Sequence, residues 1–293
     1  KNNTRLWANK GYTPNELARN LFHKKTGIIA VLVPTVAHPF FAEFVEYVEA
    51  ELYNCGYKTM LCNTVKEENA ELEYLDMLNR HIVDGVITGV HSLDVEEYLK
   101  IHKPIVALDR YLGEDIPVVA VNHKRGGRLA AEELIRSGCK SVLHFRGAQE
   151  VESPYHDRHY EFERIMKKNH VKTYAYELEW NRFDAVYYKK AVDSVFEMGI
   201  DFDGVFGVDQ LAIGYMNEAI RRHKKVPGDV KIVAYDGTYL TGIVEPQVTA
   251  VAQPMEALAR ESVRLMARLV NGKTYKNKQV LLEVELKKGK TTV

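Results

Sequence analysis

Two carboxylates stand where a parallel β-sheet would place ligand-binding groups. Asp109 follows the apolar stretch 105–108, and Asp236 follows the stretch 230–235. The carboxyl ends of strands in such sheets collect contacts with ligands. A carboxylate accepts hydrogen bonds from hydroxyl groups, and a pair of them could also serve as acid and base. The alternative is that both residues only cap turns, so the pattern predicts either a binding site or structural carboxylates.

The sequence lacks the motifs of common enzymes. It contains no Gly-x-Ser-x-Gly, no Gly-x-x-x-x-Gly-Lys-Ser/Thr and no His-Glu-x-x-His. His156 and His159 are three residues apart, but no further metal ligand follows at matching spacing. His38 precedes Pro39 and is interpreted as a turn residue. We therefore expect no catalytic residues, no cofactor and no metal.

A short basic helix is predicted near the start of the chain. Pro14 suits the first turn of a helix, and Leu17, Ala18 and Leu21 then share one face. Two turns are fewer than the roughly 12–15 residues that an isolated helix needs in water. Residues 1–26 carry six Lys and Arg against one Glu, a net charge of +5, whereas the whole chain is neutral. A short cationic helix on a neutral body indicates a polyanionic partner, most plausibly DNA.

Apolar stretches and amphipathic segments alternate along the rest of the chain, which is typical of βαβ units and parallel sheets. Two successive series of similar size predict two α/β lobes with a cleft between them. The expected strands are 27–34, 57–63, 84–88, 105–109, 118–122, 141–145, 173–177, 204–207, 230–234, 248–251 and 280–286. The expected helices follow Pro39 up to Gly56 and cover 70–79, 127–137, 161–168, 185–198, 210–222 and 255–270.

The composition is that of a globular protein with 293 residues, 46% of them hydrophobic and 27% charged. No apolar run approaches the ~20 residues of a membrane span. The first residues are polar and basic, so no signal peptide is expected. The cysteines are odd in number and predict reduced thiols in a cytoplasmic protein. They are Cys55, Cys62 and Cys139.

Several segments resemble the lactose-repressor/galactose-repressor (LacI/GalR) family of bacterial transcription factors. Residues 12–21 read Y-T-P-N-E-L-A-R-N-L, like the hinge helix of that family. The order of the later segments along one chain strengthens the resemblance, which covers residues 5–293. These segments are H-P-F-F at 38–41, V-D-G-V-I at 83–87, G-G at 126–127, V-D-Q-L-A-I-G at 208–214 and V-K-I-V-A-Y-D at 230–236.

The resemblance implies a two-lobed α/β fold of the type I periplasmic-binding-protein class, each lobe a parallel sheet flanked by helices. The boundaries we expect are a linker and hinge helix at 1–25, a first lobe at 26–146 plus 253–277, and a second lobe at 147–252 plus 278–293. The family begins with a helix-turn-helix of about fifty residues whose recognition helix enters the major groove. That module is missing here, so we expect this sequence to be a core of a longer regulator.

The resemblance also implies the partners. Paired hinge helices of a homodimer fold on operator DNA and insert an apolar side chain into the minor groove, which kinks the duplex. A small-molecule effector bound between the lobes then changes the affinity for the operator. The alternative is that this helix only covers the surface of the body. The residues implied for the hinge are Asn15, Ala18, Arg19 and Leu21.

The effector-binding residues implied by the resemblance come from both lobes. A guanidinium fork at Arg158 suits vicinal oxygens, although a surface ion pair with Glu161 or Asp157 is the alternative. An aromatic face at Trp180 could pack on a sugar, or the residue could belong to the core. The full implied set is Phe40, Phe41, Asp109, Arg158, Trp180, Asp236 and Gln253.

Two departures from the family pattern and one additional pair of residues bear on the ligand. Val208 stands where the family usually has Asn, and Glu161 stands where a Gly is common. Arg110 and Tyr111 would add a cation and an aromatic ring near the mouth of the cleft. We therefore expect a carbohydrate effector, a sugar or a larger or anionic derivative such as a sugar phosphate.

Other functions remain open at this point. A transport-type periplasmic sugar-binding protein shares the fold, but it would need an export signal and has no use for residues 12–21. A catabolite-control protein tuned by a phosphoprotein and a purine-sensing regulator fit the same class. A sugar-modifying enzyme that uses Asp109 and Asp236 is the weakest alternative.

Overall fold

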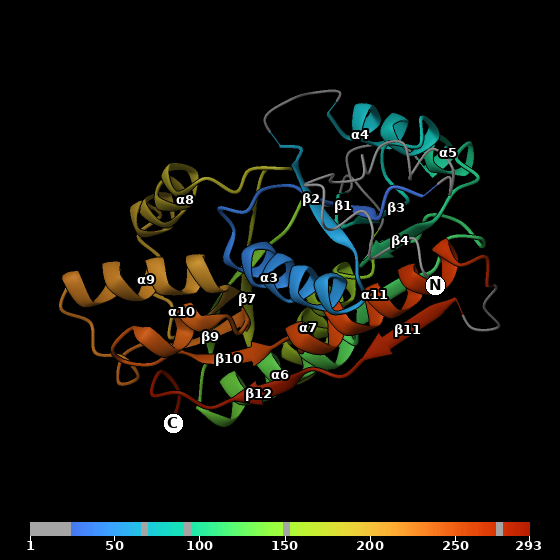
Figure 1. The fold of residues 1–293 in the computed structure, drawn as a ribbon. Coiled ribbons are helices and arrows are strands. Elements are labelled where there is room, and N and C mark those ends of the chain that lie inside the picture. The colour runs from blue at the N-terminus through green and yellow to red at the C-terminus, as the bar shows by residue number, and fades with distance from the viewer. Residues whose placement is uncertain (1–24, 66–69, 91–94, 149–152, 274–277) are drawn as a thin grey trace, which may run out of the picture.

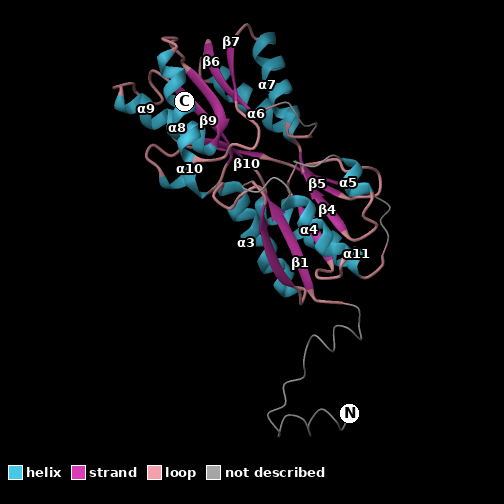
Figure 2. Ribbon diagram, turned by 90° about the horizontal axis from the view of Figure 1, so that it is seen from above, coloured by secondary structure: helices cyan, strands magenta, loops and turns pink. Residues whose placement is uncertain are grey.

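The computed structural model describes residues 25–65, 70–90, 95–148, 153–273 and 278–293. They form two lobes, each built on one six-stranded sheet with helices on both faces (Figure 1). Figure 2 shows the two sheets placed end to end, with the first lobe below and the second above. The expected fold class is confirmed: two predominantly parallel sheets flanked by helices.

The first lobe has the strand order β11-β5-β4-β3-β1-β2, and all of its ladders are parallel. Helices α3 and α11 cover one face, and α4 and α5 cover the other. The elements are β1 Ile28–Val33, α3 Pro39–Asn54, β2 Lys58–Asn63, α4 Ala70–Asn79, β3 Gly85–Thr88, α5 Val95–Leu99, β4 Ile105–Leu108, β5 Val118–Val121, α11 Met255–Val270 and β11 Gln279–Leu282.

The second lobe repeats this plan with the order β12-β10-β9-β8-β6-β7, in which only β12 is antiparallel to its neighbour. Helices α6 and α7 cover one face, and α8 and α9 cover the other. The elements are α6 His123–Arg136, β6 Ser141–Arg146, α7 His156–Lys168, β7 Lys172–Glu177, α8 Ala185–Glu197, β8 Gly204–Val208, α9 Asp209–Arg221, β9 Lys231–Asp236, α10 Tyr239–Ile243, β10 Thr249–Ala252 and β12 Glu285–Lys287.

The chain passes between the lobes after β5, after β10 and after β11. Strand β6 therefore pairs in the second sheet, although the sequence-based boundary after residue 146 places it in the first lobe. Strand β11 pairs in the first sheet, although the boundary after residue 277 places it in the second lobe. The expected single strand 280–286 is two strands in different sheets, because the chain crosses between the lobes at 283–284.

Local capping explains why α6 begins four residues before its expected start. The side chain of Asn122 accepts a hydrogen bond from the backbone N–H of Arg125 at 2.9 Å, which satisfies one free donor of the first turn. The first helical residue is thus His123, directly at the first crossing. Helix α7 likewise begins earlier than expected, at His156.

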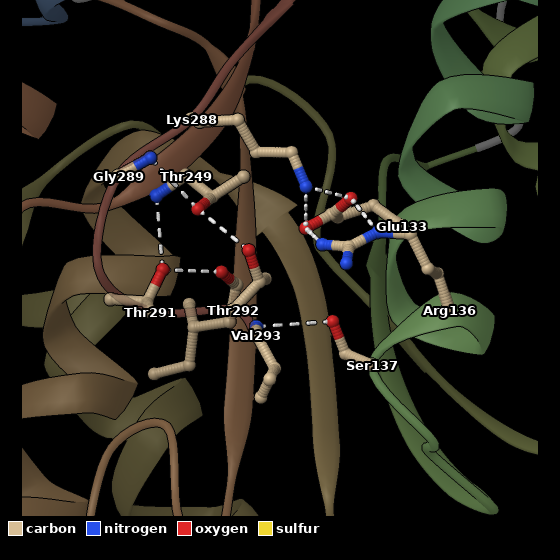
Figure 3. Close-up of polar contacts among 10 residues, drawn as sticks. Glu133, Arg136, Ser137, Thr249, Lys288, Gly289, Thr291, Thr292 and Val293 are labelled. Carbon is tan, nitrogen blue, oxygen red and sulfur yellow. Dashed lines mark hydrogen bonds and ion pairs between the residues drawn. The ribbon is translucent and has the colours of Figure 1, made fainter.

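The C-terminal residues are held against the second lobe by buried hydrogen bonds (Figure 3). The hydroxyl of Thr291 donates to the carbonyl of Ile232 at 2.6 Å and accepts from the backbone N–H of Thr249 at 2.9 Å. Nearby, the carboxylate of Glu133 on α6 contacts both Lys288 and Arg136. The chain end therefore ties β9, β10 and α6 together.

Candidate functional site

A cavity lies between the lobes and encloses about 1130 Å³, including its open mouth. Its walls come from segments that follow β1, β3 and β4 in the first lobe and β6, β7, β8 and β9 in the second. The carboxyl ends of both sheets thus face one another across it, as expected for doubly wound sheets. All seven predicted effector residues line this cavity: Phe40, Phe41, Asp109, Arg158, Trp180, Asp236 and Gln253.

Asp109 is the carboxylate that the first lobe contributes to this cavity. Its φ of 50° lies in the left-handed region, which non-glycine residues rarely adopt. Its Oδ1 accepts from the backbone N–H of Val121 at 3.3 Å and lies 3.0 Å from Nε2 of His123. The protein therefore fixes the carboxylate through Oδ1, and its side chain is 13% exposed.

Asp236 is the corresponding group of the second lobe. Its φ is 109°, and Gly237 follows with a φ of 65°, at a point where an added Cβ would lie 2.6 Å from Ala252. Asp209 accepts from the backbone N–H groups of Gly237 and Thr238, which holds this turn in place. Burial raises the pKa of Asp236, although the nearby Arg158 opposes the shift.

Gln253 connects the turn of Asp236 to the crossing before α11. Its side-chain amide donates to Asp236 Oδ1 at 2.9 Å, and its backbone N–H donates to the carbonyl of the same residue at 2.9 Å. The amide oxygen Oε1 is buried and has no hydrogen-bond partner among the described residues. Buried polar atoms are nearly always paired in proteins, so this oxygen is suited to accept from a bound molecule.

Arg158 lies on α7 between two aromatic rings. Its guanidinium carbon is 4.3 Å from the ring centre of Tyr235 and 5.4 Å from that of Tyr155. The alternative of an ion pair with Glu161 is wrong, because Glu161 binds Arg128 and Arg164 and does not line the cavity. Arg158 lines the cavity, where the N–H groups of its guanidinium can donate to a ligand.

An aromatic wall joins the two lobes. The ring centre of Phe183, from the loop after β7, is 5.7 Å from that of His38 and 6.3 Å from that of Phe41. Phe41 in turn packs edge-to-face on Phe40 at 5.1 Å. Trp180 is half-buried in the same loop as Phe183. These rings offer faces on which the C–H patches of a sugar can pack.

The expectation that His38 is only a turn residue is wrong. It lines the cavity, and its buried Nδ1 has no hydrogen-bond partner among the described residues. Burial, and then the charge of Arg158, lower the pKa of His38 to about 4. The imidazole is therefore neutral near pH 7 and can offer one donor and one acceptor to a ligand.

Sequence reasoning missed three further lining residues and most of the loop after β7. His123, Tyr155 and Tyr235 line the cavity but were not singled out, because only the packing of α6, α7 and β9 brings them together. In the loop after β7, the sequence indicated only Trp180 as a binding residue, and its neighbours in the same loop line the cavity as well. The missed loop residues that line the cavity are Leu178, Glu179, Asn181, Arg182 and Phe183.

The expected cation and aromatic ring are not part of the cavity lining. Arg110 is buried inside the first lobe, where it donates to the carbonyl of Val90 at 3.1 Å and lies over the ring of Tyr98. Neither Arg110 nor Tyr111 lines the cavity. With Glu161 also directed elsewhere, the residues that suggested an anionic ligand do not contribute to the site.

The predicted hinge residues Asn15, Ala18, Arg19 and Leu21 lie outside the described residues. Within the described part of the chain, no group of three or more His, Cys, Asp or Glu side chains is arranged to hold a metal ion. No helix there is both long and apolar enough to cross a membrane.

The fold and the interlobe cavity define a two-lobed ligand-binding protein of the periplasmic-binding-protein class. The family described as "Periplasmic binding protein-like domain" matches residues 131–292. The ribose operon repressor of Halalkalibacterium halodurans is 36% identical over 89% of this chain and 78% of its own length. The sucrose operon repressor of Streptococcus mutans is 32% identical over 89% of this chain and 80% of its own length. The chain belongs to the LacI/GalR family of transcriptional regulators.

Solved structures agree with this assignment. A periplasmic binding protein/LacI transcriptional regulator from Alkaliphilus metalliredigens, complexed with D-xylulofuranose, matches with a TM-score of 0.82 and 26% identity over 92% of this chain and all of its own. The transcription regulator CcpA of Lactococcus lactis matches with a TM-score of 0.80 and 20% identity over 92% of this chain and 100% of its own, which supports the fold alone.

Proposed function

We propose that this chain senses a neutral carbohydrate between its lobes and thereby sets the affinity of a homodimeric regulator for operator DNA. The observation that carries the proposal is the arrangement of three groups in one cavity. Asp109 from the first lobe and Asp236 from the second offer acceptor oxygens, and Arg158 offers a donor fork. Sugar hydroxyls donate to carboxylates and accept from a guanidinium, so one ligand can engage both lobes.

The charges that line the cavity favour a neutral ligand over a phosphorylated one. Two cations, Arg158 and Arg182, face three carboxylates, Asp109, Glu179 and Asp236. Arg182 is already paired, at 3.1 Å with Glu179 and 3.3 Å with Asp184. Burial raises the pKa of Asp236, so the remaining charges of the lining nearly balance, and the cavity offers no excess of positive charge to a phosphate. The relatives named for ribose and sucrose, and the neighbour solved with D-xylulofuranose, support the same class of ligand.

The volume of about 1130 Å³ counts the open mouth of the cavity, so it sets only an upper bound on the size of the ligand. The aromatic rings of Phe41 and Phe183 come from opposite lobes and pack edge-to-face, with centres 6.3 Å apart. A ligand that packs against both rings would stabilise one interlobe angle.

The regulatory step is a change in that angle. The three crossings, after β5, β10 and β11, are the points about which the lobes can turn. A turn of the first lobe changes the separation of the two hinge segments in a dimer, and with it the affinity for the operator. The effector can shift this equilibrium only by its differential affinity for the two states, typically ~1–3 kcal/mol.

A thermal-shift screen tests the ligand class. The panel contains D-ribose, D-xylulose, sucrose and cellobiose, then ribose 5-phosphate and purines. A ligand that binds only the folded state raises the melting temperature with its concentration over Kd. We expect at least one neutral sugar to raise it, and to lose this effect in Arg158→Ala but not in Arg128→Ala, whose partner is Glu161 away from the cavity. A panel in which only a purine or only a phosphate acts would contradict the proposal.

The competing functions predict other results. A catabolite-control role predicts that a phosphoprotein changes operator binding without any sugar. The chain is also similar to catabolite control protein A of Priestia megaterium, with 28% identity over 93% of this chain and 83% of that protein, which supports this alternative. An enzyme predicts turnover of a sugar in the panel. A transport protein predicts recovery of the native protein from the periplasm, whereas a regulator must fractionate with the cytoplasm.

A further inference from the structure

We propose that His123 is a positioning residue that couples the effector-binding groups of the two lobes through the chain of contacts Asp109–His123–Tyr235–Arg158. The inference rests on the proposed function, because it assigns a role in effector binding to a residue of the cavity wall that the sequence did not single out. It adds a side-chain connection between the lobes at the first backbone crossing.

The contacts of His123 run in two directions. Its Nδ1 lies 2.8 Å from the hydroxyl of Tyr235, and the two rings stack with centres 5.9 Å apart and planes at 21°. Its Nε2 lies 3.0 Å from Oδ1 of Asp109. The side chain of His123 is only 1% exposed, so solvent does not compete for either nitrogen.

One of these contacts crosses the lobe boundary and the other does not. Asp109 directly follows β4 in the first lobe, whereas His123 begins α6 and Tyr235 belongs to β9, both in the second lobe. A turn of the lobes therefore changes the contact with Asp109 and leaves the contact with Tyr235 intact. Nε2 makes no aligned hydrogen bond in the present arrangement despite the short distance. Small changes in lobe angle thus decide whether this bond is well formed.

The chemistry of the partners decides which atom donates and which accepts in each of these contacts. An ionised Asp109 only accepts, so the proton of a neutral imidazole belongs on Nε2. Nδ1 then accepts from the hydroxyl of Tyr235, and the face of the same tyrosine ring carries the guanidinium of Arg158 at 4.3 Å. The orientation of Arg158 and that of Asp109 are therefore linked through two buried side chains.

The start of α6 is shaped to allow this arrangement. An added Cβ at Gly126 would lie 2.7 Å from the hydroxyl oxygen of Tyr235, and one at Gly127 would lie 2.1 Å from the carbonyl oxygen of Arg158. Both distances are far below van der Waals contact, so two small residues are needed for α6 to approach β9 and α7. The same approach brings His123 within reach of Tyr235.

The tautomer of His123 tests the proposed series of contacts without any ligand. Long-range ¹H–¹⁵N correlation spectra of the chain distinguish protonation at Nε2 from protonation at Nδ1. We expect the Nε2–H form, and we expect its population to fall in Tyr235→Phe, which removes the donor to Nδ1. Protonation of Nδ1 alone in the unchanged chain would overturn the proposal.

Binding measurements test the coupling. The background is Trp7→Phe, which leaves Trp180 as the remaining tryptophan, and the probes are D-ribose and sucrose. We expect His123→Phe to weaken binding about tenfold or more, because it removes both polar contacts at similar shape. His123→Gln, whose amide both donates and accepts, is expected to recover affinity to within about threefold. The control His102→Phe changes an exposed histidine and should bind like the parent.

A double variant distinguishes coupled contacts from independent packing effects. If the four residues act as one series of contacts, His123→Phe combined with Tyr235→Phe weakens binding no more than about twofold beyond His123→Phe alone, because the loss of one contact already uncouples the lobes. Losses that multiply, or a Gln variant as weak as the Phe variant, would overturn the proposal. If neither of these probes nor D-xylulose nor cellobiose binds the parent chain, the proposed sugar class fails, and the tautomer measurement alone decides the role of His123.

Discussion

Asp109 and Asp236 occupy similar positions in the two lobes: Asp109 directly follows β4 and Asp236 is the last residue of β9, the third strand in the order of each sheet, and both have positive φ, 50° and 109°. Non-glycine residues in such conformations cost of order 1–3 kcal/mol and persist where the surroundings hold them. Val121 and His123 hold the first, and Gln253 holds the second. The two lobes therefore present matched acceptors to the cavity at a cost in stability, which is typical of a binding site.

Asp236→Asn is expected to trade binding for stability. Burial raises the pKa of Asp236, so the folded state binds the proton more tightly and ionisation near pH 7 opposes folding. The free energy of unfolding of the unchanged protein should therefore fall as pH rises above about 4, and the Asn variant should lack this part of the fall. We expect the variant to gain about 1 kcal/mol at pH 7 and to bind sugar at least tenfold more weakly.

Denaturant unfolding at pH 5 and pH 8 measures the first effect and a sugar titration measures the second. Asp115→Asn, at an exposed ion pair with Lys278, is the control and should leave binding unchanged. An Asp236→Asn variant that is less stable than the parent at pH 8 would contradict the assignment of a costly buried carboxylate.

Arg158→Lys is expected to weaken sugar binding by about tenfold to a hundredfold, because an ammonium cannot reproduce the planar donor fork or the stacking on Tyr235 and Tyr155. The melting temperature without ligand should change little, because the cationic charge is retained. Isothermal titration calorimetry checks the affinity, with Arg128→Lys as the matched change on the neighbouring helix. Equal affinities for Arg158→Lys and the parent would show that Arg158 only balances charge.

The Glu161 cluster between α6 and α7 predicts a loss of stability in acid. Hydrogen bonds from Arg164 and Arg128 lower the pKa of Glu161 to about 2. A lowered pKa contributes stability above about pH 4.5 that is lost as pH falls towards 2. We expect Glu161→Gln to remove about 1 kcal/mol of this acid dependence, a value reduced because both arginines are half exposed.

Urea unfolding at pH 6 and pH 3 measures this difference. Glu256→Gln at the exposed pair with Arg260 is the control and should keep the acid dependence of the parent. Identical acid dependence in Glu161→Gln and the parent would show that the cluster does not contribute to stability.

Thr291→Val is expected to destabilise the second lobe by about 1–3 kcal/mol, because it leaves the N–H of Thr249 and the carbonyl of Ile232 without their partner in a buried site. Figure 3 shows these contacts beside the ion pairs of Glu133. Thermal unfolding measures the loss, and Thr173→Val on the edge strand β7 is the matched control. A loss equal to that of the control would show that the C-terminal contacts are dispensable.

Most strands and helices could be predicted from the sequence because apolar runs and amphipathic periods are local signals. Helices α4 and α11 have the expected bounds, 70–79 and 255–270. The short helices α5 and α10, of five residues each, were missed because they are too short to show a period. Sheet membership was not local either: the run 141–146 suits either sheet, and only the crossings decide that β6 belongs to the second.

Local sequence signals predicted only part of the cavity lining as well. The seven implied residues line it because they follow strands or lie at a crossing, but their contact with an effector stays a prediction. Arg110 was misplaced because a charged residue after a strand was expected to face the cleft, whereas burial against Val90 and Tyr98 satisfies it inside the lobe. His38 and His123 depend on contacts between segments far apart in the sequence, which residue types alone do not encode.

The most direct measurement of the central claim is a titration of the Trp7→Phe chain followed by the fluorescence of Trp180, which lines the cavity. D-ribose, sucrose and ribose 5-phosphate are added in parallel to this chain and to its Arg158→Ala derivative. The account predicts a saturable change with a neutral sugar, a much weaker response to the phosphate, and loss of both in Arg158→Ala. Binding of ribose 5-phosphate that equals or exceeds that of every neutral sugar, or a response that survives Arg158→Ala, would contradict it.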